Sequence, residues 1–72
     1  MKIVNEMPTS GQFVVTWKVS SNELATEDFK WVDGVLCVYE PVSEDDEWDY
    51  MPVEDFTLYT FHKSDEVWYI VA

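Results

Sequence analysis

The residues of this chain whose types and spacing could do chemistry are carboxylates, and most of them lie in one segment. Residues 40–55 contain eight acids and no basic side chain. These acids are Glu40, Glu44, Asp45, Asp46, Glu47, Asp49, Glu54 and Asp55. Between Lys30 and Lys63 there is no Lys or Arg, and Asp33 adds a ninth acid. Opposite charges attract, so the segment favours binding of a metal ion or of a basic surface.

The spacing of these acids does not make a calcium loop. Asp45, Glu47 and Asp49 match positions 1, 3 and 5 of an EF-hand loop. Such a loop also needs Gly at position 6 and Glu at position 12, where this chain has Tyr50 and Phe56. We therefore expect no specific metal site and no cofactor, and only weak binding of divalent ions to the acidic cluster.

Groups for nucleophilic catalysis are sparse. The chain has one His and one Cys, His62 and Cys37, in different predicted strands. Cys–His catalysis needs the thiol and the imidazole within hydrogen-bond distance. Four Lys and no Arg leave little to hold an anionic substrate. We interpret His62 as an exposed or half-buried strand residue and Cys37 as an inert, outward-facing one, and we expect a protein that is not an enzyme.

Size and composition predict a single acidic β domain over residues 1–72. A net charge of −11 on 72 residues is self-repelling, which destabilises the compact state. A chain of this size buries only about 60% of its unfolded surface, and one Cys cannot form an internal disulfide. Four Trp, four Tyr and four Phe compensate, because each large ring buries about 150–250 Å². Such an aromatic content favours a folded domain over a disordered acidic tail.

Alternating hydrophobicity predicts a mainly β fold. The clearest strand is Gln12–Ser20, whose apolar side chains take one face. They are Phe13, Val15, Trp17 and Val19. Four further strands are expected at residues 28–32, 35–40, 57–62 and 67–71. Short connections favour antiparallel pairing of neighbours, which gives a five-stranded sheet or a partly closed SH3-like barrel. A curled sheet packed on one short helix is the alternative.

The pair Asp33-Gly34 predicts a hairpin and its register. A type I′ turn needs positive φ at both central residues, and an Asp-Gly pair between β-rich runs is its strongest signal. A two-residue turn sets the opposed pairs, which are Val32–Val35, Trp31–Leu36 and Phe29–Val38. The last two pairs share the core face, so Lys30 and Cys37 are expected on the other face.

Residues 43–56 are predicted to form a short acidic helix or a loop. Ser43 is a candidate N-cap, and carboxylates suit the positive end of a helix dipole. The segment also contains Trp48, Tyr50 and Met51, which are residue types that anchor interfaces. Two interpretations of the rings remain open. They anchor a partner, or Trp48 and Tyr50 fold back onto the core of a small domain that needs every ring it can bury.

The charge predicts a basic protein surface as the partner. Nucleic acid and anionic membranes attract Lys and Arg, so this chain should be repelled by both. The predicted partner-binding residues are Glu40, Glu44, Asp45, Asp46, Glu47, Trp48, Asp49, Tyr50, Glu54 and Asp55. The alternative is that this segment is a solvated loop that only keeps the protein soluble. We expect a monomer or a homodimer.

Targeting signals are not evident in the sequence. The N-terminus lacks the apolar run of a signal peptide, and no apolar stretch approaches the ~20 residues that span a bilayer. A lone Cys is typical of a reducing compartment. These features favour the cytoplasm.

The density of negative charge is comparable with that of DNA. A 72-residue domain is about 29 Å across. Duplex DNA carries about 17 charges over that length. A net charge of −11 lies within a factor of two of this value. Such a protein can compete electrostatically for a DNA-binding groove.

In these respects the chain resembles small acidic proteins encoded by bacteriophages and mobile elements. Its runs SGQFVVTW (residues 10–17) and WVDGVL (residues 31–36) are similar to those of small phage proteins. Several proteins of this class mimic DNA and block host defence, repair or nucleoid proteins. The resemblance implies an inhibitor that occupies a basic nucleic-acid-binding surface of a host protein in the host cytoplasm. The alternative is an interaction module that docks residues 44–51 on a basic groove outside any DNA site.

Overall fold

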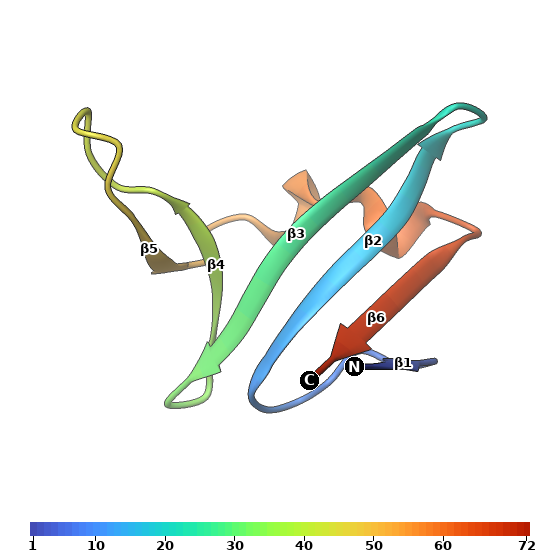
Figure 1. Cartoon of the computed structure of the whole chain (residues 1–72), viewed down its shortest axis with the longest axis horizontal. Helices are drawn as coiled ribbons and strands as arrows, with labels where there is room; N and C mark the ends of the chain where they lie inside the picture. Colours follow the sequence, from blue (N-terminus) through green and yellow to red (C-terminus); the bar gives the residue numbers. More distant parts are fainter.

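The structure, a computed structural model that describes residues 1–72, is a six-stranded antiparallel sheet with two 3₁₀ turns against one face (Figure 1). The strands are β1 (Lys2–Val4), β2 (Gln12–Ser20), β3 (Glu23–Val32), β4 (Val35–Pro41), β5 (Trp48–Pro52) and β6 (Val67–Val71). The turns η1 (Phe56–Leu58) and η2 (Thr60–Lys63) precede β6. The strand order is β1-β6-β2-β3-β4-β5, so the last strand returns beside β2 and carries β1 at the edge.

The prediction of a mainly β fold is confirmed, and the sheet is open and not closed into a barrel. It has six strands where five were predicted. Two strands, β1 and β5, were not predicted, and one predicted strand, at residues 57–62, is absent. β1 has only three residues, too few to show alternation, and it forms by pairing with β6. β3 begins at Glu23, earlier than predicted, because residues 23–27 continue the pairing with β2.

The predicted Asp33-Gly34 hairpin is confirmed. Both residues have positive φ, 51° and 80°, as a type I′ turn requires. The register is the predicted one, with Phe29 opposite Val38 and both almost fully buried. Cys37 lies on the other face as predicted, yet it is buried rather than exposed. The reason is β5, which was not predicted and which pairs Pro52 with Cys37, so that Cys37 lies inside the sheet and not at its edge.

The strand predicted at residues 57–62 is wrong. This segment forms η1 and η2, and the carboxylate of Asp55 caps η1 by accepting a hydrogen bond from the Thr57 amide at 3.0 Å. The aromatic residues that favoured a strand instead place Phe61 in the core, where it is 3% exposed. In Figure 1 these turns cross behind β2 and β3.

Of the short helix or loop predicted for residues 43–56, the loop is present at residues 43–47 and the helix is absent. Ser43 does not cap a helix, because its hydroxyl accepts from the Asp45 amide at 3.2 Å within a tight connection between β4 and β5. The Val42 amide donates to the Glu47 carbonyl at 2.8 Å and closes this connection. Asp46 adopts a left-handed conformation, with φ of 62°. Residues 48–52, rich in aromatic and apolar side chains, then pair with β4.

The core lies between the sheet and η2, and it is small and aromatic. Its six buried residues are Phe13, Val15, Trp17, Phe29, Val38 and Phe61. The ring centroids of Phe13 and Phe29 are 5.7 Å apart, and those of Trp17 and Phe61 are 5.5 Å apart. The Trp17 indole donates to Thr60 Oγ1 at 3.0 Å, which ties η2 to β2. Val19, predicted on this face, is 46% exposed because the pairing of β2 with β3 shifts between Lys18 and Ser20.

Candidate partner-binding surface

The acidic tip is the connection between β4 and β5, with the four carboxylates of Glu44, Asp45, Asp46 and Glu47. All four residues are exposed. The tip stands clear of the rest of the molecule in Figure 1. The tip and the two strands that it joins, β4 and β5, form the acidic hairpin. The one ion pair in the structure joins Lys18 and Glu66, which are 3.9 Å apart and lie outside the acidic hairpin. The carboxylates of the tip are therefore not neutralised by a cation of their own chain.

Beside the tip, three rings form an aromatic surface made of Tyr39, Trp48 and Tyr50. Tyr39 and Tyr50 lie directly opposite each other in the β4–β5 pair, with ring centroids 5.1 Å apart. The Trp48 ring lies 5.5 Å from Tyr39. Successive residues of a strand point to opposite faces, so these rings occupy the face opposite to Val38 and the core. Trp48 is 52% exposed, which excludes the interpretation that it folds back onto the core.

Polar contacts hold Tyr50 in place. The Gln12 side-chain amide donates to the Tyr50 hydroxyl at 2.6 Å and also to Asp28 Oδ1 at 3.2 Å. Lys30 Nζ lies 5.3 Å from the centroid of the Tyr50 ring, a cation–π contact. Burial, followed by the hydrogen bond to Asp28 and its negative charge, raises the pKa of Tyr50 to about 12. The ring is therefore neutral and fixed at pH 7.

Two predicted acids, Glu40 and Asp49, lie on the other face of the hairpin. They are opposed in the β4–β5 pair and alternate with the aromatic surface. Glu40 lies toward Glu27 of β3, and both are half-buried. Burial, and then the charge of Glu40, raises the pKa of Glu27. Burial, with the charges of these two acids, also raises the pKa of Tyr59. Glu40 and Asp49 thus do not share a face with Trp48.

The last two predicted acids, Glu54 and Asp55, follow β5. With Glu40 they line a shallow pocket of about 180 Å³ over Val38 and Tyr59. The hydroxyl and the amide of Thr57 hydrogen-bond Asp55 and lower its pKa. Asp55 therefore has a structural role as the cap of η1.

The ten predicted residues are thus divided among three places. The acidic tip and the aromatic surface adjoin each other, Glu40 and Asp49 face the opposite way, and Glu54 and Asp55 lie beyond β5. Three contributing residues were not predicted to belong to the site, namely Tyr39, Lys30 and Gln12. The predicted hairpin register does place Tyr39 on the same face as Lys30, so alternation alone was a signal for Tyr39. Its contact with Tyr50 depended on β5, which was not predicted.

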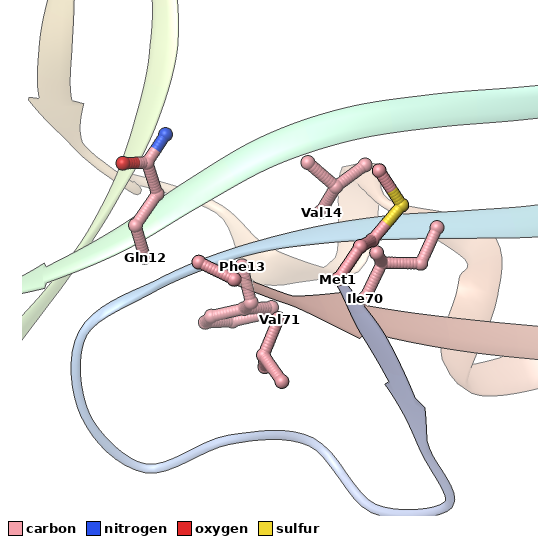
Figure 2. A pocket seen from close by; sticks show the side chains of 7 residues that line it. Met1, Gln12, Phe13, Val14, Ile70 and Val71 are labelled. Carbon is pink, nitrogen blue, oxygen red and sulfur yellow. The ribbon is translucent and has the colours of Figure 1, made fainter.

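The largest pocket lies at the opposite end of the sheet from the acidic tip. It has a volume of about 390 Å³ and is lined by Met1, Gln12, Phe13, Val14, Ile70, Val71 and Ala72. In Figure 2 Met1, Val14 and Ile70 lie together on one side of the sheet, while Phe13 and Val71 point to the other. None of the seven side chains is ionisable, so the pocket offers no side chain for acid–base chemistry.

No group of three or more His, Cys, Asp or Glu side chains is arranged to hold a metal ion. No helix has the length and the apolar character needed to cross a membrane. Cys37 is a free thiol, and the His62 ring lies on η2 with Nδ1 2.7 Å from the Tyr59 carbonyl. His62 is exposed, on a 3₁₀ turn instead of the predicted strand.

Comparison of the chain with family models, with curated proteins and with solved structures finds no match. Its function must therefore be inferred from the surface itself. The unusual feature of that surface is the combination of unpaired carboxylates at the acidic tip with exposed rings beside them.

Proposed function

We propose that the protein is a non-enzymatic acidic binding protein that occupies a basic nucleic-acid-binding surface of another protein in place of DNA. The observation that carries this proposal is the acidic tip, four exposed carboxylates on a protruding hairpin with no ion pair to their own chain. A protein groove that binds phosphates with Lys and Arg offers the cations that this tip lacks.

The dimensions of the molecule support this proposal. Its longest axis is 34 Å. Duplex DNA carries about 20 charges over that length, against a net charge of −11 for this chain. The two densities agree within a factor of two, so release of counterions should favour binding of this protein much as it favours binding of DNA.

A second candidate is an interaction module that docks on a basic groove outside any nucleic-acid site. The exposure of Trp48 favours it, because an exposed Trp beside charged residues is the type of side chain that anchors protein interfaces. In both candidates the partner is a basic protein and the binding residues belong to the hairpin. They differ in whether DNA competes for the partner.

Affinity capture followed by competition tests the proposal. The protein is immobilised, partners are captured from a bacterial lysate at low and high salt, and the captured partner is then titrated with duplex DNA. The proposal predicts capture that weakens steeply with salt and displacement of the protein by DNA. A stable ternary complex of protein, partner and DNA, without loss of affinity for either, excludes the DNA mimic and leaves the interaction module.

A matched pair of triple variants locates the binding surface. Glu44, Asp46 and Glu47 are changed together to Lys in one variant. In the control, Glu6, Glu23 and Asp65 are changed to Lys; these are also exposed acids, but they lie outside the hairpin. Both variants change the net charge equally. Loss of capture in the first alone supports the acidic tip as the site, whereas equal loss in both shows attraction by net charge only.

A further inference from the structure

We propose that the aromatic surface binds an arginine side chain of the partner, with the rings taking the place of nucleic-acid bases and the acidic tip taking the place of phosphates. This inference rests on the proposed function, since it names the chemistry of the partner at the same surface. The expected partner is therefore a protein whose nucleic-acid site contacts bases as well as the phosphate backbone.

Trp48 combines an exposed ring with a run of four acids directly before it in the chain. Trp48 is 52% exposed and Tyr39 is 41% exposed, so ring faces are open to a partner. Glu47 directly precedes Trp48, and its carbonyl accepts the Val42 amide that closes the hairpin. The four acids of the tip therefore directly precede the exposed Trp48 ring in the chain. A cation that approaches this corner meets both an ionic partner and a π face.

The chain already places one cation of its own on this surface. Lys30 Nζ lies over the Tyr50 ring at 5.3 Å, the one cation–π contact in the structure. That contact occupies the ring held by Gln12 and leaves Trp48 and Tyr39 without a cation from their own chain. Trp is the best of the three aromatic side chains for this interaction. The free position for a partner's cation is therefore at Trp48.

Arginine fits this position better than lysine does. Its planar guanidinium stacks on an aromatic face and forms two parallel hydrogen bonds with a carboxylate. A lysine ammonium is a compact, strongly hydrated charge that does neither as well. In nucleic-acid-binding proteins, guanidinium planes stack on unpaired bases, while Arg and Lys contact phosphates. A Trp next to carboxylates presents the same pair of features.

The chain provides a control in Trp68. This second tryptophan is half-buried on the same outer face of the sheet, in β6. It lines a shallow apolar depression with Ile3, Thr16, Leu24 and Ile70, none of which is ionisable. Trp68 thus has an accessible ring without neighbouring carboxylates in that depression, which separates the effect of a ring alone from that of a ring beside acids.

Calorimetric titration with nona-arginine and nona-lysine peptides tests the inference. The two peptides carry equal charge, so attraction to the net charge contributes equally to both. We expect the native protein to bind nona-arginine about fivefold more tightly, and Trp48→Leu to reduce this preference to about twofold, the part due to the carboxylates, while leaving binding of nona-lysine within about twofold. Trp68→Leu should preserve the preference. Trp48→Phe, which keeps a π face, should retain part of it.

A spectroscopic measurement on the native chain gives a second readout that needs no variant. Nona-arginine should shift the Trp48 indole N–H resonance and leave that of Trp68 in place. Equal affinity for the two peptides, or equal shifts of both indoles, overturns the arginine inference. Neither result bears on the DNA competition that tests the proposed function, and a ternary complex with DNA overturns that function without affecting the peptide preference.

Discussion

The hydroxyl of Tyr50 lies 2.6 Å from the side-chain amide of Gln12, and this hydrogen bond links two strands that are not neighbours. Gln12 belongs to β2 and Tyr50 to β5, with β3 and β4 between them. A flat sheet would separate such strands by about 14 Å. The two long side chains therefore reach toward each other across β3 and β4, which places the Tyr50 ring beside Asp28 and Lys30.

Alkaline titration should detect this contact. The pKa of Tyr50 is raised to about 12 from an ordinary value of 10.0, by burial first and by Asp28 second. We expect Asp28→Asn to lower the pKa of Tyr50, because it removes the negative charge beside the hydroxyl. Ultraviolet absorbance of tyrosinate measures the titration, and Tyr50→Phe assigns the transition. An unchanged titration in Asp28→Asn would contradict the proposed contact.

The raised pKa of Tyr50 also predicts that the fold loses stability at high pH. A tyrosine whose pKa is raised in the folded state holds its proton more tightly when folded than when unfolded. Its contribution is present below pH 10 and is lost as the pH rises toward about 12. The free energy of unfolding should therefore fall more steeply over this range in the native protein than in Tyr50→Phe, as urea denaturation at several pH values can show.

The raised pKa of Glu27 predicts that the fold gains stability in mild acid. Its pKa is raised above the ordinary 4.5 by burial and by the charge of Glu40, so the folded state takes up a proton more readily than the unfolded state. The melting temperature should rise as the pH falls from 7 toward 4.5. Glu27→Gln should raise the melting temperature at pH 7 and flatten this dependence. Glu44→Gln, at the exposed tip, is the control for a simple change of net charge.

Asp55 has the opposite effect on stability in acid, because its pKa is lowered and not raised. It therefore limits the pH range over which protonation of Glu27 stabilises the fold. Hydrogen bonds from Thr57 lower the pKa of Asp55 below the ordinary 3.8. Its contribution is present above that value and is lost as the pH falls through the lowered pKa. The gain from Glu27 therefore comes first on acidification, and the loss of the η1 cap follows at lower pH.

Local signals predicted strand β2 and the hairpin that joins β3 and β4. The alternation of Gln12–Ser20 and the Asp33-Gly34 turn depend on residues adjacent in sequence, and both predictions are confirmed. β5 was not predicted, because its five residues end at Pro52 and follow a run of acids that resembles a helix start. It forms through pairing with β4, a tertiary interaction that no short pattern reveals.

For the candidate surface, the sequence predicted which residue types are present but not which face each residue occupies. Composition identified the acids and Trp48, since charge and residue type do not depend on pairing. The division of the acids between two faces depends on whether residues 48–52 are a strand, because only a strand alternates its side chains. The prediction of a helix or loop therefore could not show that Asp49 and Trp48 point to opposite faces. Tyr39 joined the site only when β5 placed Tyr50 opposite it.

The role of η2 predicts a large effect at Phe61. This side chain is 3% exposed and contacts Trp17, Phe29 and Tyr69 through its ring. Phe61→Ala should cost about 3–5 kcal/mol of stability, as for other buried aromatic residues. Leu58→Ala, in the neighbouring turn but 74% exposed, should stay within about 0.5 kcal/mol. Denaturant unfolding measures both, and similar small losses would contradict the packing of η2 against the sheet.

The charge of the chain predicts that salt stabilises the fold. Fifteen acids face four Lys, and the one ion pair leaves nearly all of this repulsion uncompensated. Screening becomes effective beyond a Debye length of about 10 Å at 0.1 M salt, so the melting temperature should rise between low and high salt. The triple Lys variant of Glu44, Asp46 and Glu47 should show a smaller rise, because it relieves the repulsion by substitution. A melting temperature that does not change with salt would mean that the exposed acids repel one another too weakly to affect folding. The acidic tip would then lack the electric field that recognition of a basic groove requires.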